Sequence, residues 1–560
     1  MPDVPPAPAA VTTDVAPLPL AWATWPRAVT LIVAVLAARV AYLVWLSPYE
    51  LLGDEAYYWE WSRHLDLCYY EKGPGLAYLI AASTRLFGDA EWSVRLPAAV
   101  SIAVAAWACG RLAIATAGGD GRAGFVAVAV FLLLPAFQAN AQICTQDAPV
   151  TALWLLATLA GLRLVRRWRR GRTSVADWLL LSGAVGVGFL FKQSALLFGL
   201  GAAAYWVLCR RQLRWHRGLA WSLLAAAALL AALASPVVVW NAQHGWPTLA
   251  HTAGHAGMGG DKGGGGGRYD WMALPRLVGA QVGAFGPPAI ALLAAACAWA
   301  VRRRRAEPGP WVDHLFLMCS SIPAIGFFVA ISLATPVLGS WPFPSYGPLV
   351  ALLGVFAATA ASAGGRVQTG TSDAAGGPLP VRPKLPWVWK ALGVYGAVAC
   401  LLLSFPTLLG HVPLLDRTAR GPLRRIAGQR QRAVELANVA AGVRSPDGRP
   451  PVVVARYYMT AAQHAFYMPG HPTVACAGTQ LGKRPSSYDY WHELDLRGPA
   501  LIGGTMVLDG QGEYPWPTVL NFESVRPLAG GRAYVGVGYN GVSTARRHSH
   551  PARRATEPGE

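Results

Sequence analysis

The chain has 560 residues, of which 54% are hydrophobic and 14% are charged, whereas an ordinary soluble protein carries about 25% charged residues. This composition excludes a typical soluble globular protein and indicates a polytopic membrane protein. The net charge of +19 does not indicate nucleic-acid binding, because the Arg residues cluster in short loops between apolar runs, as the positive-inside rule expects of cytoplasmic loops.

Residues 1–26 are rich in Pro and Ala and predict a disordered N-terminal tail. A spanning helix needs about 20 apolar residues. Runs of this kind lie near 27–47, 93–117, 124–139, 148–165, 217–240, 276–301, 313–334, 343–363 and 386–409. A further run, 176–208, is too long for one span and is interrupted by Lys192.

Two Arg-rich loops, 163–172 and 210–217, flank this long run. Both should be cytoplasmic, so the run between them must cross the membrane an even number of times. Two short helices that meet at Lys192 satisfy this condition and bring the total to about 11 spans. The same rule places the charge-poor or acidic loops 48–92, 138–147, 241–275 and 335–342 on the outer side.

These patterns divide the chain into a transmembrane domain, 27–410, and a C-terminal soluble α/β domain, 411–545, on the outer side. Strand-like segments at 451–456 (PVVVAR) and 500–504 (ALIGG) support the second domain. Residues 546–560 predict another disordered tail. The Gly-rich stretch 257–267 lies in an outer loop and is too flexible to hold one shape alone. We expect it to act either as a cover over a lipid substrate or as a passive linker.

The first outer loop combines acids with aromatic residues. Asp54 and Glu55 follow the first span closely, and Tyr57, Tyr58, Tyr70 and Glu71 come after them. Such a mixture suits a site that deprotonates an acceptor hydroxyl and stacks a sugar ring. An aromatic belt at the membrane interface is the alternative interpretation.

The segments 53–58 (GDEAYY) and 70–74 (YEKGP) resemble the first-loop signature of bacterial glycosyltransferase family 39 and its relatives. These relatives are the protein O-mannosyltransferases and the lipid A aminoarabinose transferases. The resemblance extends over about residues 27–410, through 145–149 (TQDAP), 188–192 (GFLFK), 236–247 (PVVVWNAQHGWP) and 341–346 (WPFPSY). Where the family usually has Lys-Pro-Pro, this chain has Lys72-Gly73-Pro74.

The resemblance implies a GT-C enzyme: an all-α polytopic membrane protein with juxtamembrane helices in its first outer loop. Such an enzyme moves a sugar from a polyprenyl-phosphate donor to a lipid, glycan or protein acceptor, with inversion, on the extracytoplasmic face of the bacterial inner membrane. It needs no cofactor. Its partners are then the lipid-linked donor, an envelope acceptor and membrane lipid, with no nucleic acid.

Carried over residue by residue, the resemblance makes Asp54 the catalytic base, Glu55 its neighbour and Asp147 a second acid. Lys72 and Lys192 face the donor phosphate. Tyr346 is a further phosphate or sugar contact, and the sugar or the acceptor would meet four residues of the first loop: Tyr57, Tyr58, Tyr70 and Glu71.

The residues themselves lead to a similar expectation for Lys192. Each arm of its predicted hairpin has about 16 residues, roughly 24 Å, which is shorter than a 30 Å hydrocarbon core. The turn should therefore be recessed, where a cation needs an anionic partner. The alternatives are a Lys192 that snorkels to the interface and an Asp147 that only caps its helix.

His251 and His255 have the i,i+4 spacing that could hold a divalent metal, with His244 in the same loop. Solvated histidines are the alternative. Two other functional classes compete with the transferase. Intramembrane Lys and Asp also mark transport paths, which suggests a transporter or flippase of a lipid-linked glycan. A scaffold protein anchored by its spans is the third class.

Overall fold

The computed structural model describes residues 20–213, 215, 217–255, 270–368, 386–411, 427–510 without 492 and 494, 516–528 and 532–543. The chain divides into two compact units. The larger unit comprises Met1–Ser47, Asp66–Cys68 and Lys72–Asp416, and the smaller one comprises Pro48–Leu65, Tyr69–Glu71 and Arg417–Glu560. The first outer loop is thus divided between the units, which the sequence did not predict.

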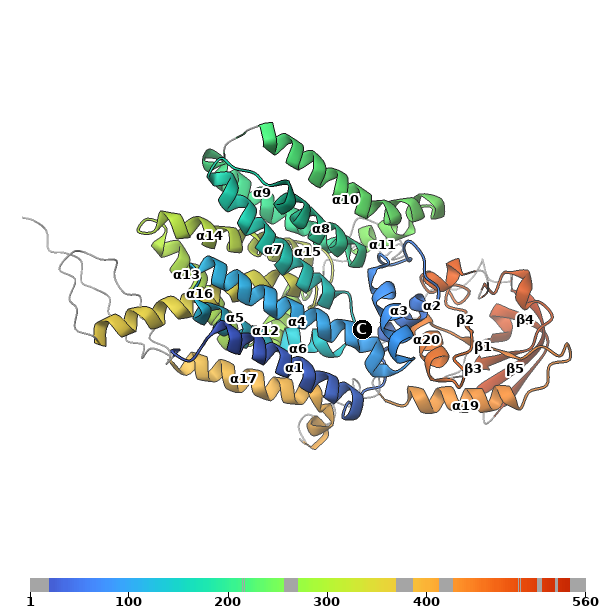
Figure 1. Ribbon diagram of the computed structural model, residues 1–560. Coiled ribbons are helices and arrows are strands. Elements are labelled where there is room, and N and C mark those ends of the chain that lie inside the picture. The colour runs from blue at the N-terminus through green and yellow to red at the C-terminus, as the bar shows by residue number, and fades with distance from the viewer. Residues whose placement is uncertain are drawn as a thin grey trace, which may run out of the picture. The chain divides into compact units, whose positions relative to one another are not determined.

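The larger unit is helical, and its long helices run side by side (Figure 1). Its α-helices are α1 (Trp25–Trp45), α3 (Gly75–Phe87), α4 (Glu91–Thr116), α5 (Gly121–Leu133), α6 (Pro135–Gln142), α7 (Asp147–Arg169), α8 (Val175–Phe191), α9 (Phe198–Cys209), α10 (Arg217–His244), α11 (Pro247–His255), α12 (Ala273–Phe285), α13 (Pro287–Arg303), α14 (Pro308–Cys319), α15 (Ile322–Ser332), α16 (Phe343–Gln368) and α17 (Pro386–Ser404).

Every predicted apolar run coincides with one helix or with a consecutive pair of helices. Within the described residues, seven segments are long and apolar enough to span a membrane, or up to nine if each of two bent pairs counts as one span. The bends are 65° between α5 and α6 and 94° between α12 and α13. Both second helices begin with Pro, which fits a first helical turn but not a helix interior. The protein is therefore a multi-pass membrane protein, and the count of 11 spans stays a prediction.

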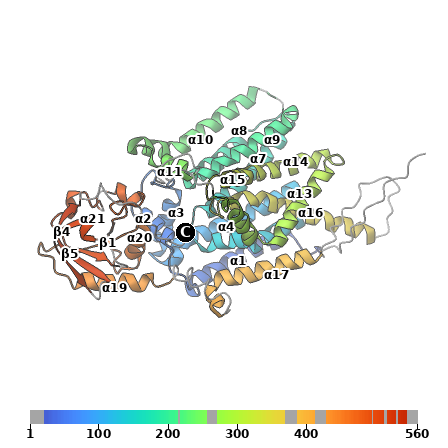
Figure 2. The same ribbon diagram turned by 180° about the vertical axis from the view of Figure 1, so that it is seen from behind.

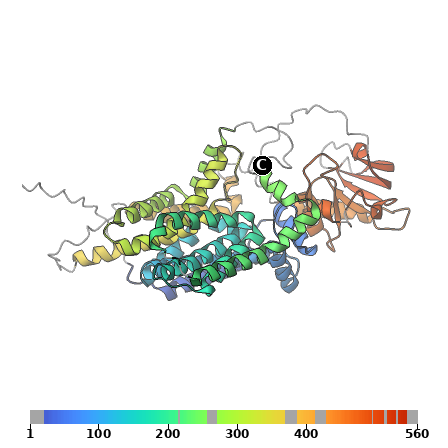
Figure 3. The ribbon, with the colours of Figure 1, turned by 90° about the horizontal axis from the view of Figure 1, so that it is seen from above.

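The run 176–208 breaks at Lys192, as the length argument predicted. Helix α8 ends at Phe191, Lys192 is extended, and the 3₁₀ turn η1 (Gln193–Leu197) leads into α9. Arg169 and Arg211, which lie on either side of the run, line one cavity. The two Arg-rich loops therefore lie at the same end of the bundle, and the run goes out and returns. Figure 3 shows α7, α8 and α10, in teal and green, running alongside one another.

The smaller unit contains a mixed five-stranded sheet with the order β2-β1-β3-β5-β4 (Figure 2). Strands β2, β1 and β3 are parallel, and β5 pairs antiparallel with β3 and β4. Its core includes Val454, Leu508, Trp516 and Tyr539. The strands and helices are β1 (Val452–Ala455), β2 (Val474–Cys476), β3 (Met506–Asp509), β4 (Leu520–Leu528), β5 (Ala533–Val542), α2 (Gly53–Arg63), α19 (Gln429–Ala441), α20 (Tyr458–Tyr467) and α21 (Trp516–Val519).

One predicted strand is confirmed and the other is wrong. The segment 451–456 contains β1, but 500–504 forms a 3₁₀ turn (Pro499–Leu501) followed by a bend. Gly503 has a φ of +75°, which a regular strand does not accommodate. The next strand starts only at Met506.

A buried polar group joins α19 and α20 to the sheet. Asp509 at the end of β3 accepts a hydrogen bond from Arg432 Nη2 at 2.6 Å, and His464 Nε2 lies 3.2 Å from its other carboxylate oxygen. All three residues are buried. Although burial raises it, the pKa of Asp509 is held below its usual range by His464 and Arg432.

We expect Asp509→Ala to destabilise the smaller unit by about 3–5 kcal/mol, because it removes the buried partner of Arg432 and leaves only the longer pair with the exposed Glu435. Thermal unfolding of the full-length protein, followed by tryptophan fluorescence, measures this loss. Asp447→Ala is the matched control, since the Asp447–Arg449 pair lies at the surface and its removal should leave the unfolding midpoint near that of the wild type. Equal midpoints for the two variants would contradict the assignment.

Candidate active site

The predicted catalytic acids begin helix α2 in the smaller unit. Asp54 and Glu55 occupy its first turn, where the helix dipole favours a negative charge. Glu55 is fully buried, and its Oε2 accepts a hydrogen bond from the backbone N–H of Leu52 at 3.0 Å. Asp54 is exposed. Of the two carboxylates, Asp54 is therefore the accessible one and Glu55 caps the helix. The catalytic roles of both stay predictions.

Glu71 is the centre of a hydrogen-bonded cluster in the same unit. Tyr57 Oη donates to it at 3.2 Å, and Arg484 Nη1 donates at 3.1 Å. Arg484 Nη2 also donates to Tyr458 Oη at 2.8 Å. Burial and the neighbouring Glu71 charge raise the pKa of Tyr57, which keeps its hydroxyl protonated as a donor. Arg484, which sequence reasoning missed, neutralises the carboxylate.

The aromatic residues of the first loop are packed rather than arranged as a belt. Tyr57, Tyr58 and Tyr70 are all buried. Tyr57 stacks on Tyr488 with ring centroids 6.0 Å apart, and the Arg484 guanidinium lies 6.0 Å from the Tyr70 ring. These contacts give the three tyrosines a structural role within the smaller unit. Their contact with a sugar or an acceptor stays a prediction.

Glu60 is a second buried acid on α2, which sequence reasoning did not single out. Its side chain is fully buried, with Arg63 Nη1 3.2 Å from Oε2. Its Oε1 has no hydrogen-bond partner in the described part of the chain. Burial raises the pKa of Glu60 to about 7, although Arg63 opposes the shift.

Lys192 forms an ion pair with Asp147 inside the larger unit. Lys192 Nζ lies 2.6 Å from Asp147 Oδ1, and both side chains are at least nine-tenths buried. The ammonium also lies 5.7 Å from the ring centre of Trp341. Asp147 is the first residue of α7, and Gln146 holds the capping position that the alternative interpretation gave to Asp147. Lys192 is thus buried and has an anionic partner, which is an acid of the same motif set. Its depth in the membrane and its contact with a donor phosphate stay predictions.

Lys72 approaches the same point from the first loop. Its Nζ donates to Gln146 Oε1 at 3.2 Å, so consecutive residues at the start of α7 hold the two lysines. The backbone beside them is also close. A Cβ at Gly73 would lie 2.3 Å from the carbonyl oxygen of Leu190. This contact explains why Gly replaces the Pro that the family has at position 73.

Several buried polar groups around these lysines lack a hydrogen-bond partner within the described residues. They are Asn140 Nδ2, Thr145 Oγ1, Gln146 Nε2 and Gln193 Nε2. Gln146 and Gln193 each adjoin a residue of the ion pair. Unpaired buried donors are rare in native proteins, and a ligand that accepts their hydrogen bonds is one explanation for them. Donor amides, two lysines and a helix N-terminus together favour an anion.

Tyr346 lies in the first turn of α16, and its ring stacks on Phe285 with centroids 4.1 Å apart. Phe285 is the last residue of α12, immediately before the 94° bend. The Phe285 contact therefore fixes the direction of the Tyr346 ring. Contact of Tyr346 with a phosphate or a sugar stays a prediction.

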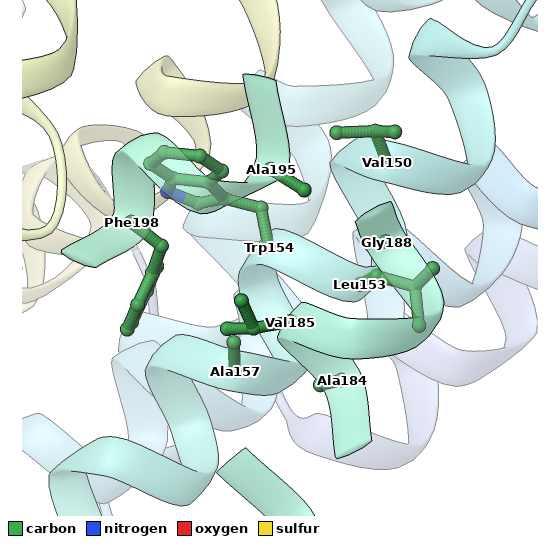
Figure 4. A pocket seen from close by; sticks show the side chains of 9 residues that line it. All are labelled: Val150, Leu153, Trp154, Ala157, Ala184, Val185, Gly188, Ala195 and Phe198. Atoms are coloured by element: carbon green, nitrogen blue, oxygen red, sulfur yellow. The ribbon is translucent and has the colours of Figure 1, made fainter. Parts of the chain in front are cut away.

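An apolar cavity of about 10 Å³ lies between α7, α8 and the start of α9 (Figure 4). The rings of Trp154 and Phe198, from different helices, lie next to each other in its wall with centroids 5.4 Å apart, and Gly188 and Ala195 come from either side of the Lys192 break. A space of this size holds at most one water molecule, and its apolar walls disfavour even that. The cavity is therefore a small gap in the packing of α7 against the segments on either side of Lys192.

The predicted metal site is only partly described. His251 is buried in α11, whereas the side chain of His255 and the Gly-rich stretch 257–267 lie outside the described residues. Within the described residues, no group of three or more His, Cys, Asp or Glu could hold a metal ion. His244 Nδ1 lies 2.8 Å from the Trp240 carbonyl oxygen. A metal at His251 and His255 and a lid at 257–267 both stay predictions.

Comparison with solved structures identifies the architecture. The chain matches ArnT from Cupriavidus metallidurans in the apo state with a TM-score of 0.56 and 17% identity, over 91% of this chain and 97% of that one. The chain has the fold of ArnT. The undecaprenyl phosphate-bound structure of the same protein matches with a TM-score of 0.55 and 18% identity, over the same shares of the two chains.

Sequence comparisons agree with this fold. Residues 71–240 match the PMT_2 family, described as dolichyl-phosphate-mannose-protein mannosyltransferase. The chain is 31% identical over 205 residues to the lipid A galacturonosyltransferase RgtD of Rhizobium johnstonii, which covers 36% of this chain and 40% of that protein. These matches confirm the resemblance to the GT-C glycosyltransferases.

A second relative is the undecaprenyl phosphate-alpha-4-amino-4-deoxy-L-arabinose arabinosyl transferase of Erwinia tasmaniensis. The identity is 25% over 403 residues, which cover 67% of this chain and 66% of that protein. The chain thus spans two fifths of the length of the first relative and about two thirds of the second.

The raised pKa of Glu60 predicts a pH-dependent stability. Between an unfolded value near 4.5 and the folded value of about 7, the folded state retains a proton that the unfolded chain loses. Stability should therefore fall as the pH rises through this window, by about 3 kcal/mol in total. Glu60→Gln should remove this slope. The buried Trp59 and Trp61 flank Glu60 and report unfolding by their fluorescence.

Glu493→Gln is the control, because its side chain is 76% exposed and the substitution should leave the slope unchanged. Unfolding midpoints of the wild type and both variants, measured between pH 5 and pH 8, test whether Glu60 causes the pH dependence. A Glu60→Gln protein with the full wild-type slope would show that another group carries the pH dependence.

Proposed function

We propose that the protein is an inverting glycosyltransferase that moves a sugar from a polyprenyl-phosphate donor to an envelope acceptor. The observation that carries this proposal is the convergence of Lys72 and Lys192 on Gln146 and Asp147, among buried amide donors with no partner in the described residues. A sugar phosphate offers the negative charge and the acceptor oxygens that such a site lacks.

The relatives support the choice of donor and of reaction. One of the two sequence relatives is named as an undecaprenyl phosphate-linked aminoarabinose transferase and the other as a lipid A galacturonosyltransferase. We infer an undecaprenyl-phosphate sugar as donor and a lipid A-type glycolipid as acceptor. The active site and the smaller unit then face away from the cytoplasm, opposite the Arg-rich loops.

In the proposed mechanism Asp54 accepts the proton of the acceptor hydroxyl as its oxygen attacks the anomeric carbon. The bond between that carbon and the phosphate oxygen breaks, and the phosphate departs with the electron pair. Lys72 and Lys192 stabilise the charge that develops on it. Asp147 positions Lys192 through the ion pair. Asp147 can do so and still act as the second catalytic acid that the sequence predicts.

We expect Asp54→Asn to lower transfer by a factor on the order of 10² to 10⁴, the usual contribution of a general base. Mass spectrometry of envelope lipids from cells that carry each variant, followed by turnover of the purified protein, measures the loss. Asp89→Asn is the control, since Asp89 is another exposed acid of the same loop region. Near-normal turnover of the Asp54 variant would remove it from the mechanism.

Lys72→Met tests the donor site separately from the chemistry. Loss of one charged contact to phosphate should weaken undecaprenyl phosphate binding about tenfold or more, corresponding to roughly 1.5–3 kcal/mol. Lys390→Met removes an exposed lysine of α17 and should bind as the wild type does. Unchanged affinity in the Lys72 variant would place the phosphate elsewhere. Binding of undecaprenol, which lacks the phosphate, should not respond to either change.

A further inference from the structure

A second polar cavity lies at the other end of α7. Its volume is about 840 Å³, and it is enclosed by the C-terminal end of α7, the 3₁₀ turn η2 (Arg210–Gln212) and the start of α14. Apart from two glycines, its lining consists of Arg166, Arg169, Arg170, Arg211, Gln212 and Asp313. Helix α7 has 23 residues, so about 33 Å separates this cavity from Asp147. It is therefore distinct from the donor site.

The lining carries an uncompensated positive charge. Four arginines and one aspartate leave a net charge of +3. Arg166 pairs with one oxygen of the aspartate, since its Nε and Nη2 lie 2.9 and 2.7 Å from Asp313 Oδ2. The other oxygen, Oδ1, lies 3.9 Å from Arg169 and has no hydrogen-bond partner among the described residues. Arg170 and Arg211 take no hydrogen-bond or ion-pair partner among the residues that the structure describes.

Two general effects explain why arginines occur here but not why they converge. Cations in the last turn of α7 oppose the helix dipole, and the positive-inside rule favours Arg in cytoplasmic loops. Neither effect requires Arg211, from a separate segment, to share a cavity with Arg170. Arg302 and Arg304 belong to another Arg-rich loop and do not line the cavity. Like charges that share a cavity repel each other unless an anion lies between them.

The chemistry of the lining selects the anion. Planar guanidinium groups bind phosphate through paired hydrogen bonds. Among the described residues, no aromatic side chain lines the cavity, so these residues offer no surface on which a nucleotide base could stack. A volume of 840 Å³ falls in the range of about 300–1,000 Å³ typical of sites for drug-sized ligands, far larger than one phosphate needs. Two phosphates would neutralise most of the +3 charge.

We propose that this cavity binds the headgroup of a phospholipid with two phosphates, such as cardiolipin, at the end of the bundle opposite the donor site. The cavity lies at the end of the apolar helix α7, and the ends of spanning helices are where lipid headgroups are found. Basic pockets between spanning helices on the cytoplasmic side are known to bind such headgroups. Arg170 and Arg211 bind the phosphates. The Arg166–Asp313 pair joins α7 to α14 and so fixes the lining of the cavity.

The test uses the full-length protein in nanodiscs of phosphatidylcholine with and without cardiolipin, with bound lipid measured by native mass spectrometry after release. The variant Arg170→Gln/Arg211→Gln removes two charges that hold no other contact, so it should fold. The matched control, Arg302→Gln/Arg304→Gln, removes two charges from exposed positions outside the cavity. We expect the first variant to lose about tenfold or more in cardiolipin affinity and the control to change less than about twofold.

Equal losses in the two double variants would overturn the proposal, because general surface charge would then explain the binding. Inorganic pyrophosphate distinguishes the source of the phosphates. If it binds as tightly as cardiolipin and displaces it, the ligand is a soluble anion and the lipid proposal fails. Should the first variant unfold, Arg170→Lys/Arg211→Lys keeps the charge but loses the paired geometry. It should still weaken cardiolipin binding, and wild-type affinity in this variant would count against the site.

Discussion

A lysine and an aspartate inside a bundle of apolar helices each carry a charge that costs several kcal/mol to bury alone. Lys192 and Asp147 meet this constraint by pairing at 2.6 Å, and the pairing determines where neighbouring elements can lie. It joins the end of α8 to the start of α7. The first-loop turn then packs against the same point, because Gly73 allows its backbone to approach Leu190. The geometry of the proposed donor site depends on this one pair.

Helix α7 connects the two polar ends of the larger unit. Its first residue is Asp147, its last turn contains Arg166, Arg167 and Arg169, and most of the residues between them are apolar and buried. The acid lies at the positive end of the helix dipole and the arginines at the negative end, so both sets of charges stabilise the helix. One element therefore sets the spacing between the proposed sugar-phosphate site and the proposed headgroup site.

The sequence predicted best those features that depend on residues close together in the chain. Apolar runs and Arg-rich loops predicted the helices, and the length of the run 176–208 predicted the break at Lys192. Asp54, Asp147 and the two lysines could be named because they lie in motifs that resemble those of family 39, and Lys192 also because it interrupts an apolar run. Arg484 could not, because its partner Glu71 is 413 positions away. Gln146 and Gln193 were missed as well, since an amide becomes informative only once its surroundings are known to be buried.

The strand predicted at 500–504 is wrong for the same reason, because a contact with a distant segment of the chain decides its conformation. Its composition favours a strand, but Gly503 donates its N–H to the carbonyl oxygen of Tyr539 from a bend rather than from a ladder. A pairing partner almost 40 positions away decides the conformation. The recruitment of most of the first outer loop into the smaller unit is a second feature of this kind. No local pattern in the sequence predicts it.

This recruitment has a consequence for biosynthesis. Leu51 donates its N–H to Tyr467, 416 positions later, and Trp59 packs edge-on against Phe466 with ring centroids 4.9 Å apart. At about 5–20 residues per second, the first loop is made roughly 20–80 s before the segment that covers it. During that time its aromatic residues have no core to enter. The growing chain therefore exposes an apolar surface early, and a chaperone or the membrane interface must cover it until the C-terminal residues are made.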